Sequence, residues 1–449
     1  MPDSEKGISR RPGVSAISKT DSSIISRGLP RASDRAVARL DRFACWTAIA
    51  FTLVLPLGTT PADAALVIGL FAWMAHKAVR SQWRFVQTPL GWLLAAWLGS
   101  VLFSMSNTID PITSLHGVRK FLKCAALYYW IVETVSSVSK LRGVIAASMV
   151  SMTCVVLDGL WQRLTGWDLL RHRPLMTALP FMDSPEGFQR VTATFPHPND
   201  LAIYLISVLP LVVVLGVFGP KRWRAPAFVS ALMSIVVMVL AFSRAGVLAL
   251  GGALLTLGLS LRRRAPWMLL AILGALAVVA TPEPARSWVR SQASWVDVLT
   301  EPERQMYWRT ASNMIQAHPV FGIGTNTFSK AYPSYREAGD RFAEAGPYAH
   351  NQYLHLAAEQ GLVGLAVFLL FVVRVFRMSH GVQTLVSRES LVSMTNLGLR
   401  AALVGYLILG CLESSLFYAR GSLVFWWIVS LMSALWRLTR PAGPGLLTR

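Results

Sequence analysis

Charged residues are scarce in this sequence. Asp, Glu, Lys and Arg make up 15% of its 449 residues, whereas soluble globular proteins average about 25%. Hydrophobic residues make up 53%, and the mean hydropathy is +0.47. This composition argues against a soluble domain and predicts a protein that crosses a membrane several times.

Acidic residues are the rarer charged type, with 23 Asp and Glu against 43 Lys and Arg and a formal net charge of +20. A strongly basic chain can indicate a nucleic-acid partner. Here, however, the basic residues form short clusters between apolar runs, which is typical of cytoplasmic loops beside anionic lipid. We therefore expect membrane lipids, and no nucleic acid, as partners of these clusters.

The motifs of several enzyme classes are also missing. The sequence has no Asp-x-Asp pair of the kind that holds a divalent metal on a diphosphate, no serine nucleophile elbow and no Cys-x-x-Cys spacing. Its four cysteines, which we interpret as packing residues, are Cys45, Cys124, Cys154 and Cys411. We expect no metal and no cofactor, and a direct displacement without a covalent intermediate.

Twelve apolar runs approach the ~20 residues that a helix needs to cross a membrane. They lie at 43–60, 62–79, 88–106, 117–136, 141–161, 198–218, 225–243, 245–262, 266–281, 352–375, 396–416 and 422–438. Helices are expected because each span must satisfy its own backbone in lipid. The sequence thus predicts an all-α integral membrane protein with about twelve transmembrane helices, nine within 43–281 and three within 352–440. The count is least secure at 225–262, where only Ser243–Gly246 separates two runs.

The basic clusters predict how these helices are oriented. Residues 1–42 are expected to form a disordered basic cytoplasmic tail, and 441–449 a second cytoplasmic tail. Alternation then places the basic connections inside, as the positive-inside rule requires. The outer connections are 57–62, 107–118, 162–197, 243–246, 282–351 and 417–421. The main exception is a basic group, Arg119, Lys120 and Lys123, near the outer end of the fourth span.

The longest polar interval, 282–351, is expected to be an ordered periplasmic loop before the tenth span. Apolar residues recur at helical spacing from Met306 to Ala317, and Gly322 and Gly324 then predict a turn. These glycines do not continue into the Gly-Lys-Ser/Thr of a phosphate loop, so we reject a nucleotide site there. Loops of this length are usually functional or disordered, and the aromatic residues of this one favour order.

His350, where this loop meets the tenth span, is the first catalytic candidate. A neutral imidazole, whose ordinary pKa is about 6.5, can accept a proton from a hydroxyl group. The alternative is an interfacial histidine that only caps the helix through Asn351.

Two arginines are candidates for binding phosphate. Arg244 lies between two apolar spans, where a charged residue is costly and is a functional candidate by default, and Arg304 lies in the long loop. A guanidinium group stays charged and matches phosphate oxygens with a planar fork of donors. The alternatives are contact with lipid phosphates for Arg244 and an ion pair with Glu301 or Glu303 for Arg304.

Two further candidates lie near the sixth span. Arg190 precedes this span and could converge with Arg244 and Arg304. Asn199 lies in the Pro-Asn-Asp sequence that opens it, a composition typical of a helix start. Contact with a sugar or phosphate is a weaker alternative for this segment.

The order and spacing of these elements resemble the O-antigen ligase family. The motifs that carry the resemblance are Phe195-x-x-Pro198-Asn199-Asp200, Ser243-Arg244-Ala245-Gly246, Arg304-x-x-x-Trp308, His318-Pro319-x-x-Gly322-x-Gly324, His350-Asn351-x-x-Leu354 and Glu359-x-Gly361. They cover roughly residues 190–365, and the expected topology fits the rest of the chain. Ser-Arg-Ala-Gly stands where Ser-Arg-Gly is commoner in the family, but the arginine is retained.

The resemblance implies a glycosyltransferase in the inner membrane of a Gram-negative bacterium. Its members transfer a glycan from undecaprenyl diphosphate to an acceptor hydroxyl at the periplasmic face, with neither metal nor nucleotide sugar. By this resemblance His350 is the general base and Arg244 and Arg304 bind the diphosphate, so that transfer inverts the anomeric carbon. Further substrate contacts are expected at Arg190, Asn199, Trp308, His318, Asn351 and Tyr353.

The acceptor divides this family. The short region after the last span favours a ligase that uses a lipid A–core sugar hydroxyl over the protein-glycosylating members. A Wzy-type polymerase remains the alternative. A transporter or flippase for lipid-linked glycan is the alternative from another class, but it would need a polar path through the membrane, and the ionisable residues here lie mainly at one boundary.

Overall fold

The computed structural model describes residues 32–177, 189–261, 302–337 and 348–440. The helices are α1 (Ala32–Val54), α2 (Thr59–Val79), α3 (Gly91–Ser104), η1 (Met105–Asn107), α4 (Pro111–Thr134), α5 (Val138–Thr165), α6 (Pro198–Phe218), α7 (Lys221–Leu240), α8 (Arg244–Leu261), α12 (Pro302–Ala317), α13 (Phe328–Tyr335), α14 (Gln352–Leu385), α15 (Leu391–Leu409) and α16 (Ala419–Leu438). Two short strands, β1 (Met176–Thr177) and β2 (Gln189–Arg190), pair antiparallel.

Seven of the described helices are long and apolar enough to cross a membrane: α2, α5, α6, α7, α14, α15 and α16. The prediction of an all-α membrane protein is therefore confirmed, whereas a total of twelve spans is not. Helix α8 is apolar but shorter, α3 has only 14 residues, and α1 and α4 carry several charged side chains. The expected ninth span, 266–281, lies outside the described residues.

The N-terminal boundary differs from our prediction. Residues 32–42, which we expected within the disordered tail, form the first turns of α1. Their sequence is rich in Ala, Arg and Leu, which have high helix propensity, and Asp41 forms an ion pair with Lys140 of α5 at 2.6 Å. Helix α1 thus begins within the segment that we predicted as a tail.

The eleventh span also differs, and this difference matters for the site. Helix α15 begins at Leu391, where Ser390 caps it by accepting a hydrogen bond from the Ser393 N–H at 3.1 Å, and it ends at Leu409. We predicted that this span reaches residue 416. In the structure the polar sequence after Leu409, which includes Glu413, instead forms a connection between α15 and α16 (residues 410–418).

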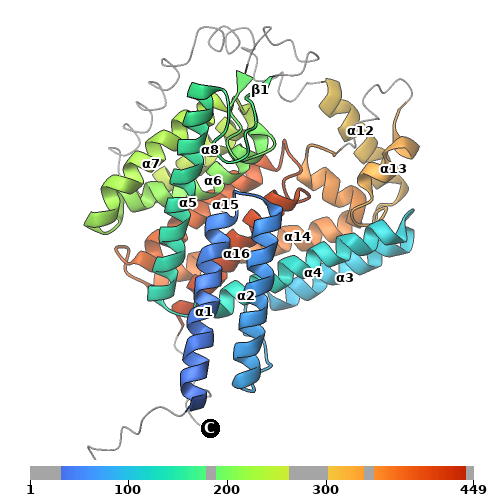
Figure 1. Cartoon of the computed structure of the whole chain (residues 1–449). Helices are drawn as coiled ribbons and strands as arrows, with labels where there is room; N and C mark the ends of the chain where they lie inside the picture. The colour runs from blue at the N-terminus through green and yellow to red at the C-terminus, as the bar shows by residue number, and fades with distance from the viewer. Residues whose placement is uncertain (1–31, 178–188, 262–301, 338–347, 441–449) are drawn as a thin grey trace, which may run out of the picture.

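Helix α15 packs against α6, α8 and α16, and α14 packs against α3, α12 and α16. In Figure 1, α1, α2 and α5 run nearly parallel, whereas α3 and α4 lie side by side at a steep angle to them. Helices α12 and α13 lie at the upper right, where both contact α14. The described part of the long loop thus contains two helices, α12 and α13, and rests on a helix of the membrane bundle.

Aromatic rings fill the contact between α3, α14 and α16. The Trp97 ring stacks on Trp426 at 5.6 Å and also contacts Phe368 and Phe371. Its indole N–H donates to the Gln360 Oε1 at 3.0 Å. Lipid tails are as apolar as the side chains, so close packing and such polar contacts, rather than water exclusion, hold membrane helices together.

The turn after α12 packs backbone to backbone against a kink in α14. Gly361 breaks that helix with a φ of 69°, and a Cβ there would lie 2.1 Å from the Val320 carbonyl oxygen. Gly322 has a φ of 72°, and a Cβ there would lie 2.4 Å from the carbonyl carbon of Glu359. Both positions need glycine because of their left-handed backbone and the absence of room for a side chain. The Gly-x-Gly and Glu-x-Gly motifs therefore join the external loop to α14.

Candidate active site

His350 is held by the start of α14. The next residue, Asn351, is the N-cap: its side chain accepts hydrogen bonds from the Tyr353 and Leu354 N–H groups, both at 3.0 Å, and donates to the Cys411 carbonyl oxygen at 3.1 Å. His350 has a φ of 44°, which is uncommon for a residue with a Cβ. The cap thus fixes the backbone in a conformation that turns His350 out of the helix.

The imidazole of His350 faces a buried carboxylate. Its Nδ1 lies 3.3 Å from the Glu413 Oε2, and the exposed side-chain fraction is 30% for His350 but 2% for Glu413. The Tyr307 ring of α12 stacks on the other side, with centroids 5.5 Å apart. A neutral His350 that donates its Nδ1 proton to the carboxylate carries its lone pair on Nε2. The arrangement is therefore suited to a general base.

The two groups of this pair influence each other's ionisation. Burial opposes protonation of His350, but the hydrogen bond and charge of Glu413 outweigh it and raise the pKa of the imidazole above its ordinary value. Burial likewise opposes ionisation of Glu413, but the hydrogen bond and charge of His350, with the charges of Arg304 and His197, hold the pKa of the carboxyl below its usual range. Glu413 is thus a buried carboxyl group whose ionised form is favoured mainly by its contact with His350 and by the charge of Arg304.

Asn199 connects this pair to the rest of the site. Its Nδ2 donates to the Glu413 Oε1 at 2.6 Å. Its Oδ1 accepts from the Ser243 hydroxyl at 3.1 Å and from the Arg190 guanidinium at 3.4 Å. Because both ends of this amide are engaged, its orientation is determined, and it must act as a donor towards Glu413.

Arg190, from β2, fixes the turn between α7 and α8. Its guanidinium donates to the Ala241 and Phe242 carbonyl oxygens at 3.0 and 3.2 Å. Burial, together with the charge of Arg244, lowers the pKa of Arg190 to about 10, so the group remains charged at neutral pH. We predicted Arg190 as a substrate contact from the sequence. In the structure its guanidinium holds the turn that precedes Arg244.

Arg244 and Arg304 approach the pair from two different helices. Arg244 is the first residue of α8 and is partly buried. It is near enough to Arg190 to lower the pKa of that group. Arg304, in the first turn of α12, is also partly buried, and its charge lowers the pKa of both His350 and Glu413. The three residues that we predicted to be catalytic therefore share one region.

Four helices begin at this region: α6, α8, α12 and α14. The N-terminal end of a helix carries a partial positive charge and backbone N–H groups that have no partner within the helix. Together with the arginines, these ends make the region strongly attractive to an anion such as a phosphate.

Other predicted contacts have partners of their own. His318 directly follows α12, and its Nε2 lies 3.1 Å from the hydroxyl of Tyr335, the last residue of α13. The Tyr353 hydroxyl donates to the Leu407 carbonyl oxygen at 2.8 Å. These interactions, like the Asn351 cap, stabilise the fold, and no hydrogen bond within the described chain joins His318 or Tyr353 to the His350–Glu413 pair. Trp308 lies one turn after Arg304, partly buried, and its indole N–H has no hydrogen-bond acceptor in the described part of the chain.

Glu413 and Ser243 belong to the site but were not predicted from the sequence. Glu413 falls inside the predicted span 396–416, and Ser243 entered only as part of the motif around Arg244. An acidic residue beside a long apolar run was a usable signal. Its partner, however, is 63 residues away in the chain, and spacing alone does not reveal it. Within the described ranges, no three His, Cys, Asp or Glu side chains converge as they would around a metal ion.

A comparison with curated proteins gives no match. Comparison with protein families does: residues 228–369 match the model of a family described as O-antigen ligase. The match begins within α7, ends within α14 and includes Arg244, Arg304 and His350. The resemblance predicted from the motifs is thus confirmed over this region, which matches the O-antigen ligase family.

Proposed function

We propose that this protein is an O-antigen ligase that transfers a glycan from undecaprenyl diphosphate to a lipid A–core sugar hydroxyl. The reaction takes place at the periplasmic face of the inner membrane of a Gram-negative bacterium, with both termini of the chain in the cytoplasm. The family match supports a glycosyltransferase of the ligase and polymerase type acting on lipid-linked glycan and a lipid acceptor. The roles that we propose for individual residues rest on the site.

In the proposed reaction, His350 Nε2 accepts the proton of the acceptor hydroxyl. The oxygen attacks the anomeric carbon of the donor sugar as the bond from that carbon to the diphosphate oxygen breaks. The electron pair of the broken bond leaves with the diphosphate, and the attack inverts the anomeric configuration. Neither metal nor nucleotide is required for this displacement.

The arginines would act where negative charge increases. The leaving diphosphate gains charge as the bond breaks, and a preorganised donor at that position lowers the barrier more than it stabilises the substrate. In this proposal Arg244 and Arg304 bind the diphosphate, and the N-terminal ends of the neighbouring helices contribute. Arg190 and Asn199 position these groups, and Trp308 contacts the substrate.

The observation that carries the proposal is the contact of His350 with ionised Glu413, next to Arg304. A histidine that only capped a helix would need no buried carboxylate on its Nδ1, since Asn351 already caps α14. A partly exposed imidazole with its Nδ1 fixed and cations close by is instead the arrangement expected of a base beside an anionic leaving group.

The test is a transfer assay with purified protein. Undecaprenyl-diphosphate-linked glycan and rough lipopolysaccharide are mixed with the wild-type protein or the His350→Ala variant in the presence of EDTA, and products are separated on a gel. We expect the wild-type protein to move glycan onto the lipid A–core band and His350→Ala to be inactive. The control is His380→Ala, because His380 is an exposed histidine of the same helix.

Each other outcome would contradict a part of the proposal. Longer carrier-linked chains without a change in the lipid A–core band would establish the polymerase. Normal transfer by His350→Ala would remove the general base. Loss of wild-type activity in EDTA that magnesium restores would reveal a metal, and movement of donor across a vesicle membrane without transfer would favour the transporter.

A further inference from the structure

A cavity lies among α3, α4, α14 and α16, and its lining does not include His350. Its volume is about 110 Å³, far below the ~300–1,000 Å³ of pockets that enclose a drug-sized ligand. It is nevertheless larger than the ~10–15 Å³ that one water requires. A cavity of this size accommodates one end of a ligand, and the rest of that ligand must lie outside it.

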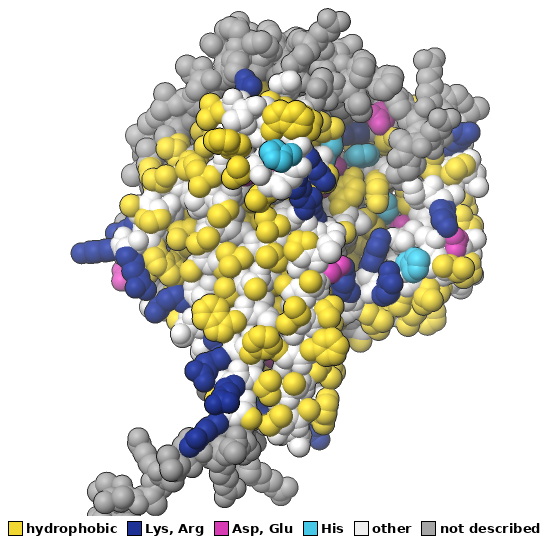
Figure 2. All heavy atoms as spheres, viewed as in Figure 1, with side chains coloured by type: hydrophobic (Ala, Val, Ile, Leu, Met, Phe, Trp, Pro, Cys, Tyr) yellow, Lys and Arg dark blue, Asp and Glu magenta, His cyan; other side chains and the backbone are white. Residues whose placement is uncertain are grey.

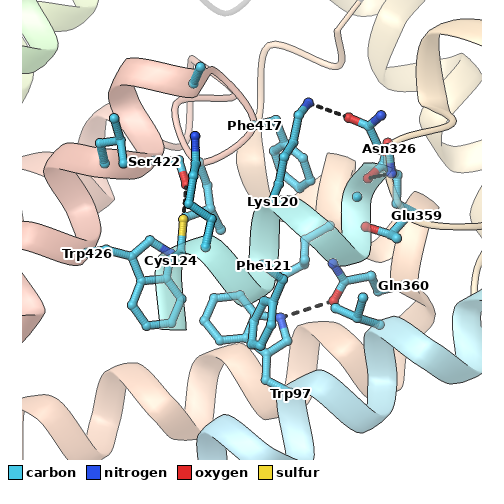
Figure 3. Close-up of a pocket in the computed structure, with 18 residues that line it drawn as sticks. Trp97, Lys120, Phe121, Cys124, Asn326, Glu359, Gln360, Phe417, Ser422 and Trp426 are labelled. Carbon is cyan, nitrogen blue, oxygen red and sulfur yellow. Dashed lines mark hydrogen bonds between the residues drawn. The ribbon is translucent and has the colours of Figure 1, made fainter. Parts of the chain in front are cut away.

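The lining of this cavity is polar at one end and aromatic at the other. Lys120 and Asn326 lie at the upper end in Figure 3, where Lys120 Nζ donates to the Asn326 Oδ1 at 2.6 Å. The rings of Trp97, Phe121 and Trp426 lie at the lower end. Such a lining matches a molecule that carries charge at one end and hydrocarbon at the other.

Lys120 is the cation best able to receive an anion here. Lys123, which also lines the cavity, already pairs with the Asp63 carboxylate at 3.0 and 3.1 Å. Within the described chain, Lys120 has the neutral amide of Asn326 and no carboxylate within ion-pair distance. A lysine without a paired carboxylate at the mouth of a cavity favours phosphate or another anion.

Glu359 is the acidic residue among the lining side chains. Its carboxylate accepts hydrogen bonds from the Asn326 and Phe328 N–H groups at 2.7 and 3.0 Å. It also lies 3.3 Å from the His355 Nε2. These donors occupy the carboxylate within the protein, so Lys120 remains the accessible charge.

The outer surface of α4 beside this cavity carries exposed apolar side chains. Leu115 and Leu122 are exposed there, at 59% and 48%, with the exposed Arg119 between them. Figure 2 shows a hollow right of centre in which Lys or Arg, acidic and His side chains lie among hydrophobic ones. The charged end of the cavity thus adjoins a surface suited to acyl chains.

From these features we propose that the cavity binds a phosphate-bearing lipid. The phosphate contacts Lys120, and one apolar chain lies against Trp97, Phe121 and Trp426. Phe417, in the 410–418 connection that also carries Glu413, lines the cavity. Its ring stacks on His355, with centroids 3.8 Å apart. None of the polar residues that line the cavity belongs to the His350 site. The proposal is independent of glycan transfer.

The proposal explains the basic group that departs from the positive-inside pattern. Lysines at the outer end of a span are unexpected if they only set topology. A headgroup ligand gives Lys120 a function on that side.

The test measures lipid binding to the full-length protein in detergent by native mass spectrometry, with phosphatidylglycerol, phosphatidylcholine and inorganic phosphate as probes. We expect the wild-type protein to prefer phosphatidylglycerol. Lys120→Gln should weaken its binding about fivefold, the effect of one basic residue beside an anionic headgroup. The matched control is Arg119→Gln, which removes an equal charge from an exposed neighbouring residue that does not line the cavity.

A second variant tests the place of binding. Ala419→Trp fills the mouth of the cavity at an exposed lining position, so it should weaken phosphatidylglycerol binding without changing charge. Thermal melts of all variants confirm folding. Equal losses in Lys120→Gln and Arg119→Gln would overturn the proposal, as would undiminished binding to Ala419→Trp or equal affinity for phosphatidylcholine. Binding of inorganic phosphate at Lys120 without binding of lipid would show a free-anion site instead.

Discussion

Replacement of Glu413 by Gln preserves the size of the side chain but should impose the wrong tautomer on His350. Asn199 can only donate towards residue 413, because its own oxygen already accepts from Ser243 and Arg190. The new amide must therefore point its oxygen at Asn199 and its NH₂ at the His350 Nδ1. That nitrogen then becomes an acceptor, the proton moves to Nε2, and the lone pair needed by a base is lost.

The expected fall in kcat follows from the free energy needed to restore the productive tautomer of His350 in this variant. To restore the productive tautomer, the NH₂ of the introduced glutamine would have to face the Asn199 NH₂, leaving two buried donors without acceptors. Each such group costs about 1–3 kcal/mol, and each 1.4 kcal/mol is a factor of about ten. A general base contributes ~10²–10⁴-fold, so we expect kcat to fall on the order of 10²–10³-fold.

The Glu413→Ala variant separates the effect of the wrong tautomer from the effect of losing the carboxylate. Alanine removes the partner of His350 without imposing either tautomer, so it should retain at least as much activity as the isosteric glutamine. The assay is the initial rate of glycan transfer at saturating acceptor, with a thermal melt of each variant. Glu337→Gln, at an exposed carboxylate that pairs with Arg309, is the control. Near-wild-type kcat for Glu413→Gln would refute the role assigned to the pair.

Three further predictions use the same structure. Arg244→Lys should lower kcat by at least about tenfold because a point charge cannot replace a planar fork on a diphosphate; wild-type rates would instead favour a simple contact with lipid. Glu413 raises the pKa of His350 above its ordinary value of about 6.5, and only the neutral imidazole is a base. The transfer rate should therefore fall as the pH decreases through this raised pKa. In Glu413→Gln the pKa is no longer raised, so the fall in rate should occur at a lower pH. Gly361→Ala should lower thermal stability by at least about 2 kcal/mol, because a left-handed alanine alone costs ~1–2 kcal/mol and its Cβ would strike the Val320 carbonyl. In that experiment Gly381→Ala, on the same helix with nothing within 4 Å of its Cβ, should be neutral or stabilising.

Apolar periodicity predicted most of the fold because membrane helices are apolar along their whole length. The prediction was least accurate at the ends of helices, because short-range hydrogen bonds determine where a helix begins and ends. The Ser390 cap starts α15 at Leu391, ahead of the predicted start at 396, and Glu413 consequently moved out of a predicted span. The split between α7 and α8 at Arg244, by contrast, was predicted correctly, because a charged residue within an apolar run is costly.

The site was only partly predictable, for a different reason. Residue type and motif order indicated His350, Arg244 and Arg304, to which we assign the chemistry of the proposed reaction. They did not indicate which residues position these groups. Asn199 contacts partners 9, 44 and 214 residues away, and such long-range pairing depends on how helices pack. For the same reason the contact between His318 and Tyr335 was not predicted from the sequence.

The balance of charge explains why a buried carboxylate belongs in this site. Three guanidinium groups, those of Arg190, Arg244 and Arg304, would repel one another if they converged without an anion, and the helix N-termini add to that repulsion. Glu413 offsets part of it while it orients His350. The remaining positive charge suits a diphosphate, whose charge grows as it leaves. In the proposed reaction the carboxylate thus serves the base and the leaving group together, and its removal should impair both.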